Sequence, residues 1–214
     1  MTRLLQGLPP GEQAQVDEIL AGCTTLALRV GAARGGARIP EAALLVVEEG
    51  LVLLSSARAG SSRRMAVALA GSEEVLLPPA ADERLEALED SWLTVVSPAA
   101  LAALLAVPAA GAVVVDALGA ALRERQETIG NFASVRHVDR RVREKLLQLA
   151  RAHGKVVPGG VRLDLPLTHE LVGEMVGSAR ETVTWAFAQL AREGFARREG
   201  RAYRLAVSPE ALAS

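Results

Sequence analysis

Residues 167–183 of this 214-residue chain read Leu-Thr-His-Glu-Leu-Val-Gly-Glu-Met-Val-Gly-Ser-Ala-Arg-Glu-Thr-Val. The hydroxyl of Thr168 suits the cap of a helix, where it accepts a hydrogen bond from a free backbone amide, so a short helix is predicted over residues 169–176. Gly177 follows directly, where a tight turn needs a residue that tolerates a positive φ. This half of the segment therefore predicts a capped helix and the turn that ends it.

A second helix is predicted after that turn. Ser178 and Glu181 have the Ser-x-x-Glu spacing of a capping box, in which two side chains satisfy two free amides. Gly173 lies four residues before the turn and leaves room for two short helices to cross closely, while Val183 can fill the angle between them. The segment as a whole predicts a helix-turn-helix.

The neighbouring residues predict a winged form of this motif. Residues 195–198 and 201–205 read as two strands joined by a Glu-Gly turn, which predicts a β-wing. An amphipathic helix over residues 139–153 and a strand over residues 161–165 are predicted before the motif.

The N-terminal half has a different pattern, with brief apolar runs separated by Gly, Pro and Ser. Regularly spaced short strands of this kind are typical of an antiparallel barrel or sandwich. Glu49-Gly50 and residues 59–61 are expected to supply hairpin turns. The predicted strands cover residues 26–30, 44–48, 51–56, 65–70, 75–77 and 92–96.

Beyond Ser97 and Pro98 the pattern becomes helical, with a short helix that Pro108 ends and a longer one over residues 109–135. Apolar residues recur along the longer helix with heptad-like spacing around one polar position, which favours pairing with a second copy of the chain. An ordinary helix packed against its own domain is the alternative. The expected dimer contacts are Val115, Leu118, Leu122, Arg125, Ile129 and Phe132.

The Val-Gly-x-x-Arg-Glu-Thr-Val core of residues 176–183 closely resembles the DNA-binding signature of the Crp/Fnr family of bacterial transcription regulators. The resemblance extends to residues 49–52 and 87–90. It implies an α+β fold with an N-terminal antiparallel β-roll, a cupin-like jelly roll that serves as sensor domain. The implied domains are residues 1–108 for the β-roll, 109–136 for the dimerisation helix and hinge, and 137–214 for the winged helix-turn-helix. The resemblance also implies a homodimer on near-palindromic double-stranded DNA, with RNA polymerase as a further candidate partner.

The start of a helix placed in the major groove meets base edges. Arg180 can donate two hydrogen bonds to guanine and Glu181 can accept one from cytosine; alternatively, Glu181 only completes the capping box. Thr184 and Trp185 stand where family members carry a further arginine, so a different base preference is expected, with Trp185 against a thymine methyl or in the core. The expected phosphate contacts are His169, Ser178, Thr182, Arg197, Arg198 and Arg201, and for these arginines a solvated surface is the alternative.

The sensor region does not favour a cyclic nucleotide. Family members that bind one use an Arg-Ser or Arg-Thr pair, whereas Arg84 here precedes Leu85. Five carboxylates in residues 73–86 would repel a phosphate. We therefore expect another effector or none, and no cofactor.

Other classes are disfavoured by residue usage. A single cysteine, Cys23, excludes a disulfide framework and a cysteine-ligated metal site within one chain. Three scattered histidines do not support haem or a metal site, and no catalytic motif occurs, so no enzymatic activity is expected. The chain is expected to be cytoplasmic, without a membrane segment.

The charge is unevenly distributed along the chain. The net charge is −1, yet residues 136–214 contain 14 basic against 9 acidic residues. This excess favours a nucleic-acid partner for the C-terminal part. Two alternatives remain open: a winged helix that binds protein while the β-roll serves as scaffold, and a regulator gated by an unidentified small effector.

Overall fold

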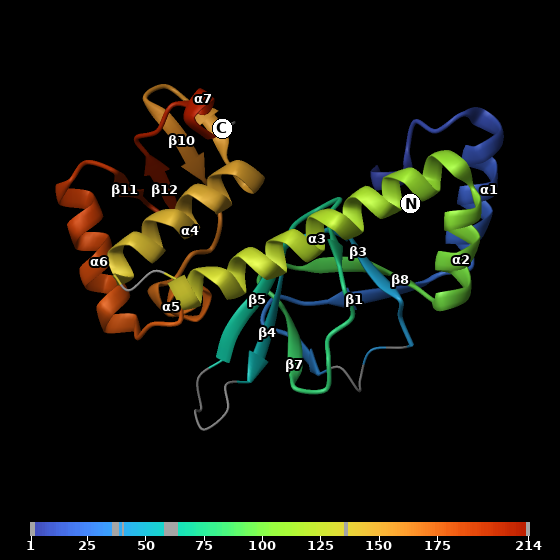
Figure 1. Ribbon diagram of the computed structural model, residues 1–214, viewed down its shortest axis with the longest axis horizontal. Helices are drawn as coiled ribbons and strands as arrows, with labels where there is room; N and C mark the ends of the chain where they lie inside the picture. The colour runs from blue at the N-terminus through green and yellow to red at the C-terminus, as the bar shows by residue number, and fades with distance from the viewer. Residues whose placement is uncertain (1–2, 36–38, 40, 58–63, 135–136, 213–214) are drawn as a thin grey trace. The chain divides into compact units, whose positions relative to one another are not determined.

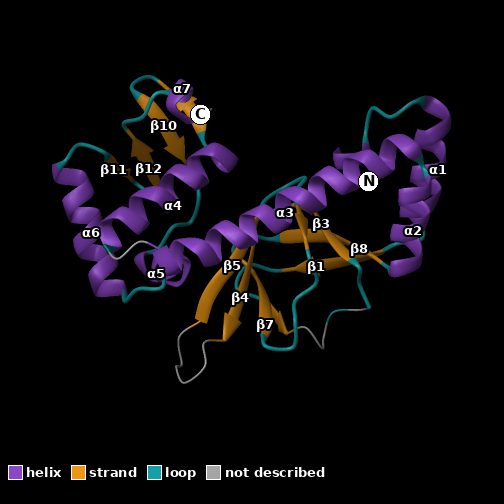
Figure 2. Cartoon of the chain, in the orientation of Figure 1, coloured by secondary structure: helices purple, strands orange, loops and turns teal. Residues whose placement is uncertain are grey.

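The computed structural model describes residues 3–35, 39, 41–57, 64–134 and 137–212, with the backbone alone for residues 129–134. The chain divides into two units, Met1–Glu127 and Thr128–Ser214. Figure 1 follows the chain through both units, and Figure 2 distinguishes their helices and strands. Within the described ranges, no helix is long and apolar enough to cross a membrane. The three domain boundaries expected from the sequence stay a prediction.

Antiparallel strands and short helices make up the N-terminal unit. All six predicted strands are present, with ends that differ by at most two residues. The strands are β1 Thr24–Leu28, β2 Ala33–Gly35, β3 Leu44–Glu49, β4 Val52–Ala57, β5 Arg64–Ala70, β6 Val75–Leu76, β7 Glu83–Ala87 and β8 Ser91–Val96. The helices are the 3-10 helix η1 Arg3–Leu5, α1 Pro10–Ala21, α2 Pro98–Ala106 and α3 Pro108–Ser134, whose last seven residues belong to the second unit.

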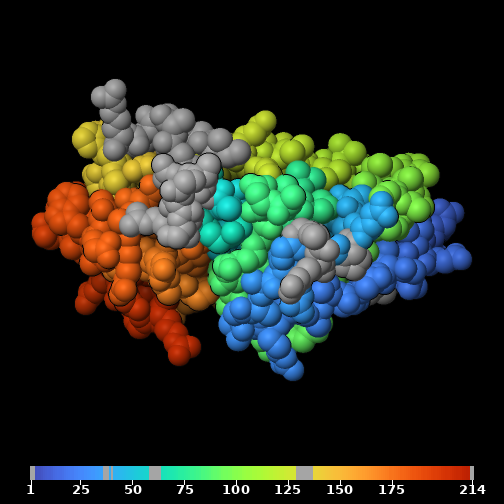
Figure 3. Space-filling view, turned by 90° about the horizontal axis from the view of Figure 1, so that it is seen from below, coloured from blue at the N-terminus to red at the C-terminus, as the bar shows by residue number. Residues whose placement is uncertain are grey.

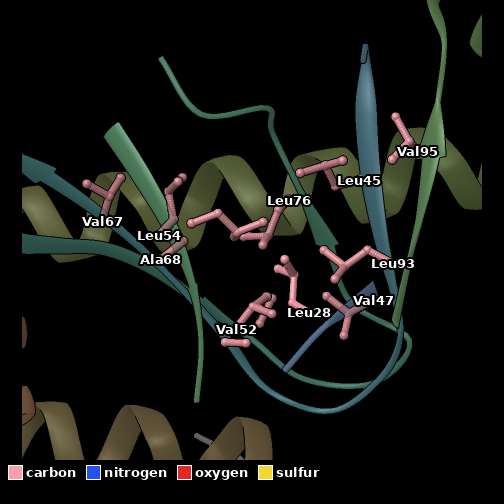
Figure 4. Packing of buried hydrophobic residues seen from close by; sticks show 13 residues of the cluster. Leu28, Leu45, Val47, Val52, Leu54, Val67, Ala68, Leu76, Leu93 and Val95 are labelled. Atoms are coloured by element: carbon pink, nitrogen blue, oxygen red, sulfur yellow. The ribbon is translucent and has the colours of Figure 1, made fainter. Parts of the chain in front are cut away.

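The strands form two four-stranded sheets, in the orders β1-β8-β3-β6 and β2-β7-β4-β5. Apolar side chains of both sheets share one core, as Figure 4 shows for Leu54 of one sheet and Leu93 of the other. Burial of this apolar surface is the main term that holds two such sheets face to face. The predicted α+β fold with an antiparallel β-roll is confirmed.

The turn at Gly50 has another role than the predicted hairpin. The strands on either side of it, β3 and β4, belong to different sheets and do not pair with each other. Gly50 has a φ of 95°, and a Cβ there would lie 2.3 Å from Ser91 Oγ. The local sequence therefore specified the turn, but this turn carries the chain from one sheet to the other. The hairpin turn expected at residues 59–61 lies outside the described residues.

Strand β7 was missed by the sequence analysis. Its sequence, Glu-Arg-Leu-Glu-Ala, alternates between buried and half-buried positions, as a strand on a core does. One of its inward positions is Glu83, which is why the apolar alternation was not visible. The short strands β2 and β9 were also missed, because three residues give too little pattern.

A second apolar cluster joins helices to the outer face of the first sheet. Ser97 caps α2, since its hydroxyl accepts a hydrogen bond from the amide of Ala100 at 3.2 Å. The start of α3 is buried in this cluster through Ala110 and Val114. The first third of α3 is thus fixed to the β-roll by ordinary core packing.

The C-terminal unit contains a helical layer and a four-stranded sheet in the order β11-β12-β10-β9. Its helix α4 has the expected strongly amphipathic pattern, with one face buried. The elements are α4 Val138–His153, β9 Lys155–Val157, β10 Gly160–Leu163, α5 His169–Val176, α6 Arg180–Arg192, β11 Ala196–Glu199, β12 Ala202–Leu205 and α7 Pro209–Leu212.

Candidate nucleic-acid interface

Helix α5 begins and ends as the sequence predicts. The hydroxyl of Thr168 accepts a hydrogen bond from the amide of Leu171 at 3.0 Å. Gly177 has a φ of 63° and ends the helix in the left-handed region, and the amide of Ser178 then donates to the carbonyl of Gly173 at 2.9 Å. These bonds satisfy one of the backbone groups that a helix leaves free at each end.

Helices α5 and α6 cross at Gly173. A Cβ at this position would lie 2.8 Å from the carbonyl oxygen of Ser178, closer than real contacts allow. Val183 is completely buried in α6, in the core of the same unit. The predicted helix-turn-helix is confirmed, together with the reason for its glycine.

The predicted capping box is wrong. Helix α6 begins at Arg180, with Ala179 in the cap position, and no side chain in the described part of the unit caps it. The carbonyl oxygen of Ser178 instead lies close to Gly173, so the close crossing of the two helices holds Ser178 in the turn. Glu181 therefore has no capping partner in Ser178, and its carboxylate is exposed at the start of the helix.

One face of α6 is exposed to solvent. Arg180, Glu181, Thr184 and Trp185 lie on it, at the spacing that brings residues to one side of a helix. Trp185 is 57% exposed, so the expectation that it joins the core is wrong. Figure 3 shows one side of the surface of the C-terminal unit, in orange and red. An arginine, a carboxylate and an indole here form a surface suited to contact with base edges.

The wing consists of β11 and β12, paired antiparallel about Gly200, which has a φ of 63°. Arg197, Arg198 and Arg201 are exposed on it. Arg198 Nε donates to the carbonyl of Gly200 at 3.1 Å, within the turn of the wing. The predicted wing is confirmed, and its arginines form an exposed basic edge.

His169, at the start of α5, contacts two other elements of the unit, α6 and β12. Its Nδ1 lies 2.8 Å from the hydroxyl of Thr184, and that hydroxyl donates to the carbonyl of Arg180 at 2.9 Å. Its Nε2 lies 3.4 Å from the phenol of Tyr203. The ring stacks on Phe187 with 4.9 Å between centroids. Both ring nitrogens are therefore turned toward the chain itself, while the predicted phosphate contact stays a prediction.

Burial lowers the pKa of His169, and the positive charges of Arg198 and Arg180 lower it further. Burial raises the pKa of the Tyr203 phenol, against the opposing effect of Arg198. At neutral pH the imidazole is therefore uncharged, and the phenol keeps the proton that it can donate.

Behind the exposed face, α6 is held to α4 by contacts that the sequence analysis missed. Arg143 Nη2 lies 2.8 Å from a carboxylate oxygen of Glu193, and its guanidinium stacks over the ring of Phe195 at 4.0 Å. A planar cation can make both contacts at once. Arg143 lies about 50 residues before its partners, so no local pattern could reveal this support.

The predicted dimer contacts on α3 include exposed side chains and side chains that pack within their own unit. Val115 and Leu122 are 61% and 47% exposed. Leu118 packs in part against the apolar cluster of its own unit, as the alternative interpretation of the helix expects. The side chains of Ile129 and Phe132 lie outside the described residues.

Arg125 forms an ion pair with Glu83 of the same chain. The Glu83 side chain is only 4% exposed and also accepts a hydrogen bond from the amide of Ala80 at 2.9 Å. One residue earlier, Glu124 accepts from the amide of Leu69 at 3.2 Å. These side chains join α3 to the β-roll, and Glu124 and Arg125 line a small cavity with Leu54, Ala68, Val75, Leu76, Leu77 and Ala121.

Other polar groups of the N-terminal unit have partners within it. Arg84 forms an ion pair with Glu86, two positions along the same strand. Asp82 accepts a hydrogen bond from the hydroxyl of Ser56 at 2.8 Å, which lowers the pKa of that carboxyl. Several of the charges that the sequence analysis singled out thus serve the roll itself.

Comparison with known proteins agrees with this geometry. Residues 140–214 match the Crp-like helix-turn-helix domain. The chain is 38% identical over 81 residues to a CRP-like cAMP-activated global transcriptional regulator of Mycobacterium tuberculosis (strain ATCC 25618 / H37Rv). The aligned residues make up 37% of this chain and 36% of that protein. The match thus spans about a third of the relative's length.

Two solved structures share the fold over most of the chain. A mutant of CooA from Carboxydothermus hydrogenoformans has a TM-score of 0.75 at 21% identity, over 92% of this chain and 88% of that one. A transcriptional regulator of the CRP/FNR family from Thermus thermophilus has a TM-score of 0.62 at 24% identity, over 89% of this chain and 96% of that one. Residues 140–214 therefore contain a Crp-like helix-turn-helix domain, and the chain as a whole shares the fold of these two solved structures.

Proposed function

We propose that the protein is a sequence-specific DNA-binding regulator of transcription that acts as a homodimer on a near-palindromic operator without cyclic AMP. Its α6 enters the major groove. The observation that carries the proposal is the exposed set of Arg180, Glu181 and Trp185 at the start of a helix whose other face is buried.

Arg180 and Glu181 are the base-reading residues of this proposal. A guanidinium offers two parallel donors to guanine, and a carboxylate accepts from the cytosine amine. Trp185 has no donor that suits guanine O6 and N7 together, so it favours an apolar contact such as a thymine methyl. Thr184 lies on the same face and presents its methyl group, because its hydroxyl is bonded to Arg180 and His169.

The backbone contacts of the proposal come from the turn and the wing. They orient the helix but carry no sequence information. The residues assigned to them are Ser178, Thr182, Arg197, Arg198 and Arg201, all of which are at least partly exposed.

The homodimer is supported by the exposed apolar residues of α3. Val115 and Leu122 are seven residues apart and lie on one side of the helix, as the seam of a coiled coil requires. A two-fold dimer matches a palindromic site, with half-sites about 34 Å apart on one face of DNA.

Independence from cyclic nucleotide is supported by the charges that face the roll. Glu83 is already neutralised by Arg125, and Glu124 already occupies the amide of Leu69. A nucleotide phosphate in the cavity would meet the carboxylate of Glu124, and it could pair with Arg125 only by breaking the ion pair with Glu83.

Selection from random DNA by the purified protein tests the proposal. Enrichment of one palindrome, equal with and without cyclic AMP, is the expected result. Enrichment that needs an added metabolite would instead show that the regulator is gated by a small effector. If neither condition enriches any sequence, DNA binding is refuted and a protein partner for the winged helix becomes the better explanation.

A further inference from the structure

His169 lies at the point where α5, α6 and the wing meet. Its contacts reach Thr184 on α6 and Tyr203 on β12, and its ring lies parallel to that of Phe187 within 11°. Phe187 in turn packs against Tyr203 with 4.8 Å between centroids. A single side chain thus joins the three elements whose relative placement decides which atoms of α6 reach the DNA.

The hydrogen bonds determine which nitrogen of the ring carries the proton. The hydroxyl of Thr184 has one hydrogen, and donation to the carbonyl of Arg180, four residues earlier, uses it. Toward His169 the hydroxyl can then only accept, so Nδ1 carries the proton. Nε2 has a free lone pair, which can accept from the phenol of Tyr203. The neutral Nδ1–H ring satisfies every group in this chain.

Resting on the proposed function, we infer that His169 is a positioning residue: in its neutral Nδ1–H form it holds Thr184, and through it the first turn of α6, in the orientation that presents Arg180 to DNA. The bond between Thr184 and the carbonyl of Arg180 is the step that transmits the constraint, because such a bond adjusts the local bend of a helix. Tyr203 and Phe187 fix the ring from the other side.

Protonation of His169 opposes this arrangement. An imidazolium has no acceptor for the phenol of Tyr203, so the hydrogen bond that the phenol donates to Nε2 is lost. The charged and titratable groups that act on it are Arg180 of α6, Arg198 of β11 and Tyr203 of β12, and both arginines repel an added positive charge. The lowered pKa of His169 places this loss below its ordinary value of 6.5. Operator affinity is therefore expected to fall as the pH drops through that range.

The direction of this pH dependence distinguishes a positioning role of His169 from a phosphate contact. If His169 binds a DNA phosphate, the imidazolium is the better ligand, and operator affinity rises as the pH falls. The first experiment measures the Kd of the full-length dimer for its selected operator from neutral pH down to about one unit below the ordinary histidine pKa. Weaker binding at low pH is expected, and tighter binding at low pH would overturn the positioning role.

Matched variants assign the effect. Thr184→Val removes the hydroxyl at nearly constant volume, and it should weaken binding at neutral pH by about two- to ten-fold, the range of one net hydrogen bond. It should also flatten the pH profile, and adding His169→Ala to it should cause little further loss, because both changes break one chain of bonds. The control variant His137→Gln/His153→Gln removes the other two histidines and should keep the profile. Independent losses from His169→Ala and Thr184→Val would count against the inference.

A measurement without DNA keeps the inference separate from the proposed function. Nitrogen-15 NMR of the full chain distinguishes a protonated from an unprotonated ring nitrogen, and His169→Gln identifies the signals of His169. A protonated Nδ1 and a bare Nε2 at neutral pH are expected. The opposite tautomer would refute the network even if the protein binds its operator, whereas failure of DNA selection with the expected tautomer would refute the proposed function alone.

Discussion

Arg180 and Arg201 illustrate how two exposed arginines of one unit are expected to differ in their contribution. Arg180→Ala should weaken operator binding by about 1–3 kcal/mol and relax the preference at one base pair, because a bidentate contact to guanine is lost. Arg201→Ala should weaken binding to all sequences alike and reduce the slope of log K against log salt by about one, since it removes a phosphate contact. Competition binding against a library of single-position operator variants measures both. An unchanged base preference in Arg180→Ala would contradict the base-reading role.

Gly173 is important because it has no side chain at the point where α5 and α6 cross. In Gly173→Ala the new methyl group would lie 2.8 Å from the backbone oxygen of Ser178, which cannot move without opening the turn. The free energy of unfolding should fall by about 1–3 kcal/mol, as overpacking usually causes. Urea unfolding followed by circular dichroism measures the change. Gly11→Ala in α1 is the control, because its Cβ would meet nothing within 4 Å, and an equal loss there would remove the steric explanation.

At the scale of elements, the ion pair of Arg125 and Glu83 ties α3 to β7. Arg125→Met should lower the free energy of unfolding of the N-terminal unit by about 1–3 kcal/mol, because a buried carboxylate keeps only one hydrogen bond. Adding Glu83→Gln to it should restore most of the loss, since the uncompensated charge disappears. Thermal unfolding of the four proteins of this cycle measures the coupling between the two residues. Additive losses would show that the pair does not act as a unit.

The exposed apolar residues of α3, Val115 and Leu122, lead to a prediction about dimer formation. Leu122→Lys should weaken the dimer without unfolding the subunit, because this side chain is 47% exposed in the single chain. Leu105→Lys on α2 changes a leucine of similar exposure, 44%, and should leave assembly unchanged. Sedimentation velocity over a range of protein concentrations compares them. A monomeric wild-type protein at micromolar concentration would refute the dimer itself.

Local signals in the sequence were sufficient for the helix-turn-helix and failed where distant residues decide. Thr168, Gly173 and Gly177 act on neighbours within a few positions, so the short helix and its turn could be predicted. The alternation of β7 was hidden because its buried Glu83 depends on Arg125, 42 residues away. The capping box failed for a related reason: the close crossing at Gly173 fixes Ser178, and this tertiary contact overrides the preference of serine for a cap.

For the whole molecule, we expect cyclic AMP to leave the melting temperature unchanged even at millimolar concentration. A ligand that binds the folded state must raise that temperature by mass action. Arg125, the basic residue that lines the cavity, is already paired with Glu83, so the nucleotide phosphate gains no free cation there. Differential scanning fluorimetry measures this, with the selected operator as the positive control. A concentration-dependent rise with cyclic AMP would reopen the cavity as a nucleotide site.

The two tryptophans of the chain stand in the two units, Trp92 in β8 and Trp185 on the exposed face of α6. The exposed indole of Trp185 allows DNA binding to be followed by intrinsic fluorescence. Contact with a duplex should shift the tryptophan emission to shorter wavelength and quench it. Replacing Trp92 by phenylalanine would leave a single-tryptophan protein whose titration needs no dye. The residue that sets this chain apart from the arginine-bearing family pattern would then report on each encounter with DNA.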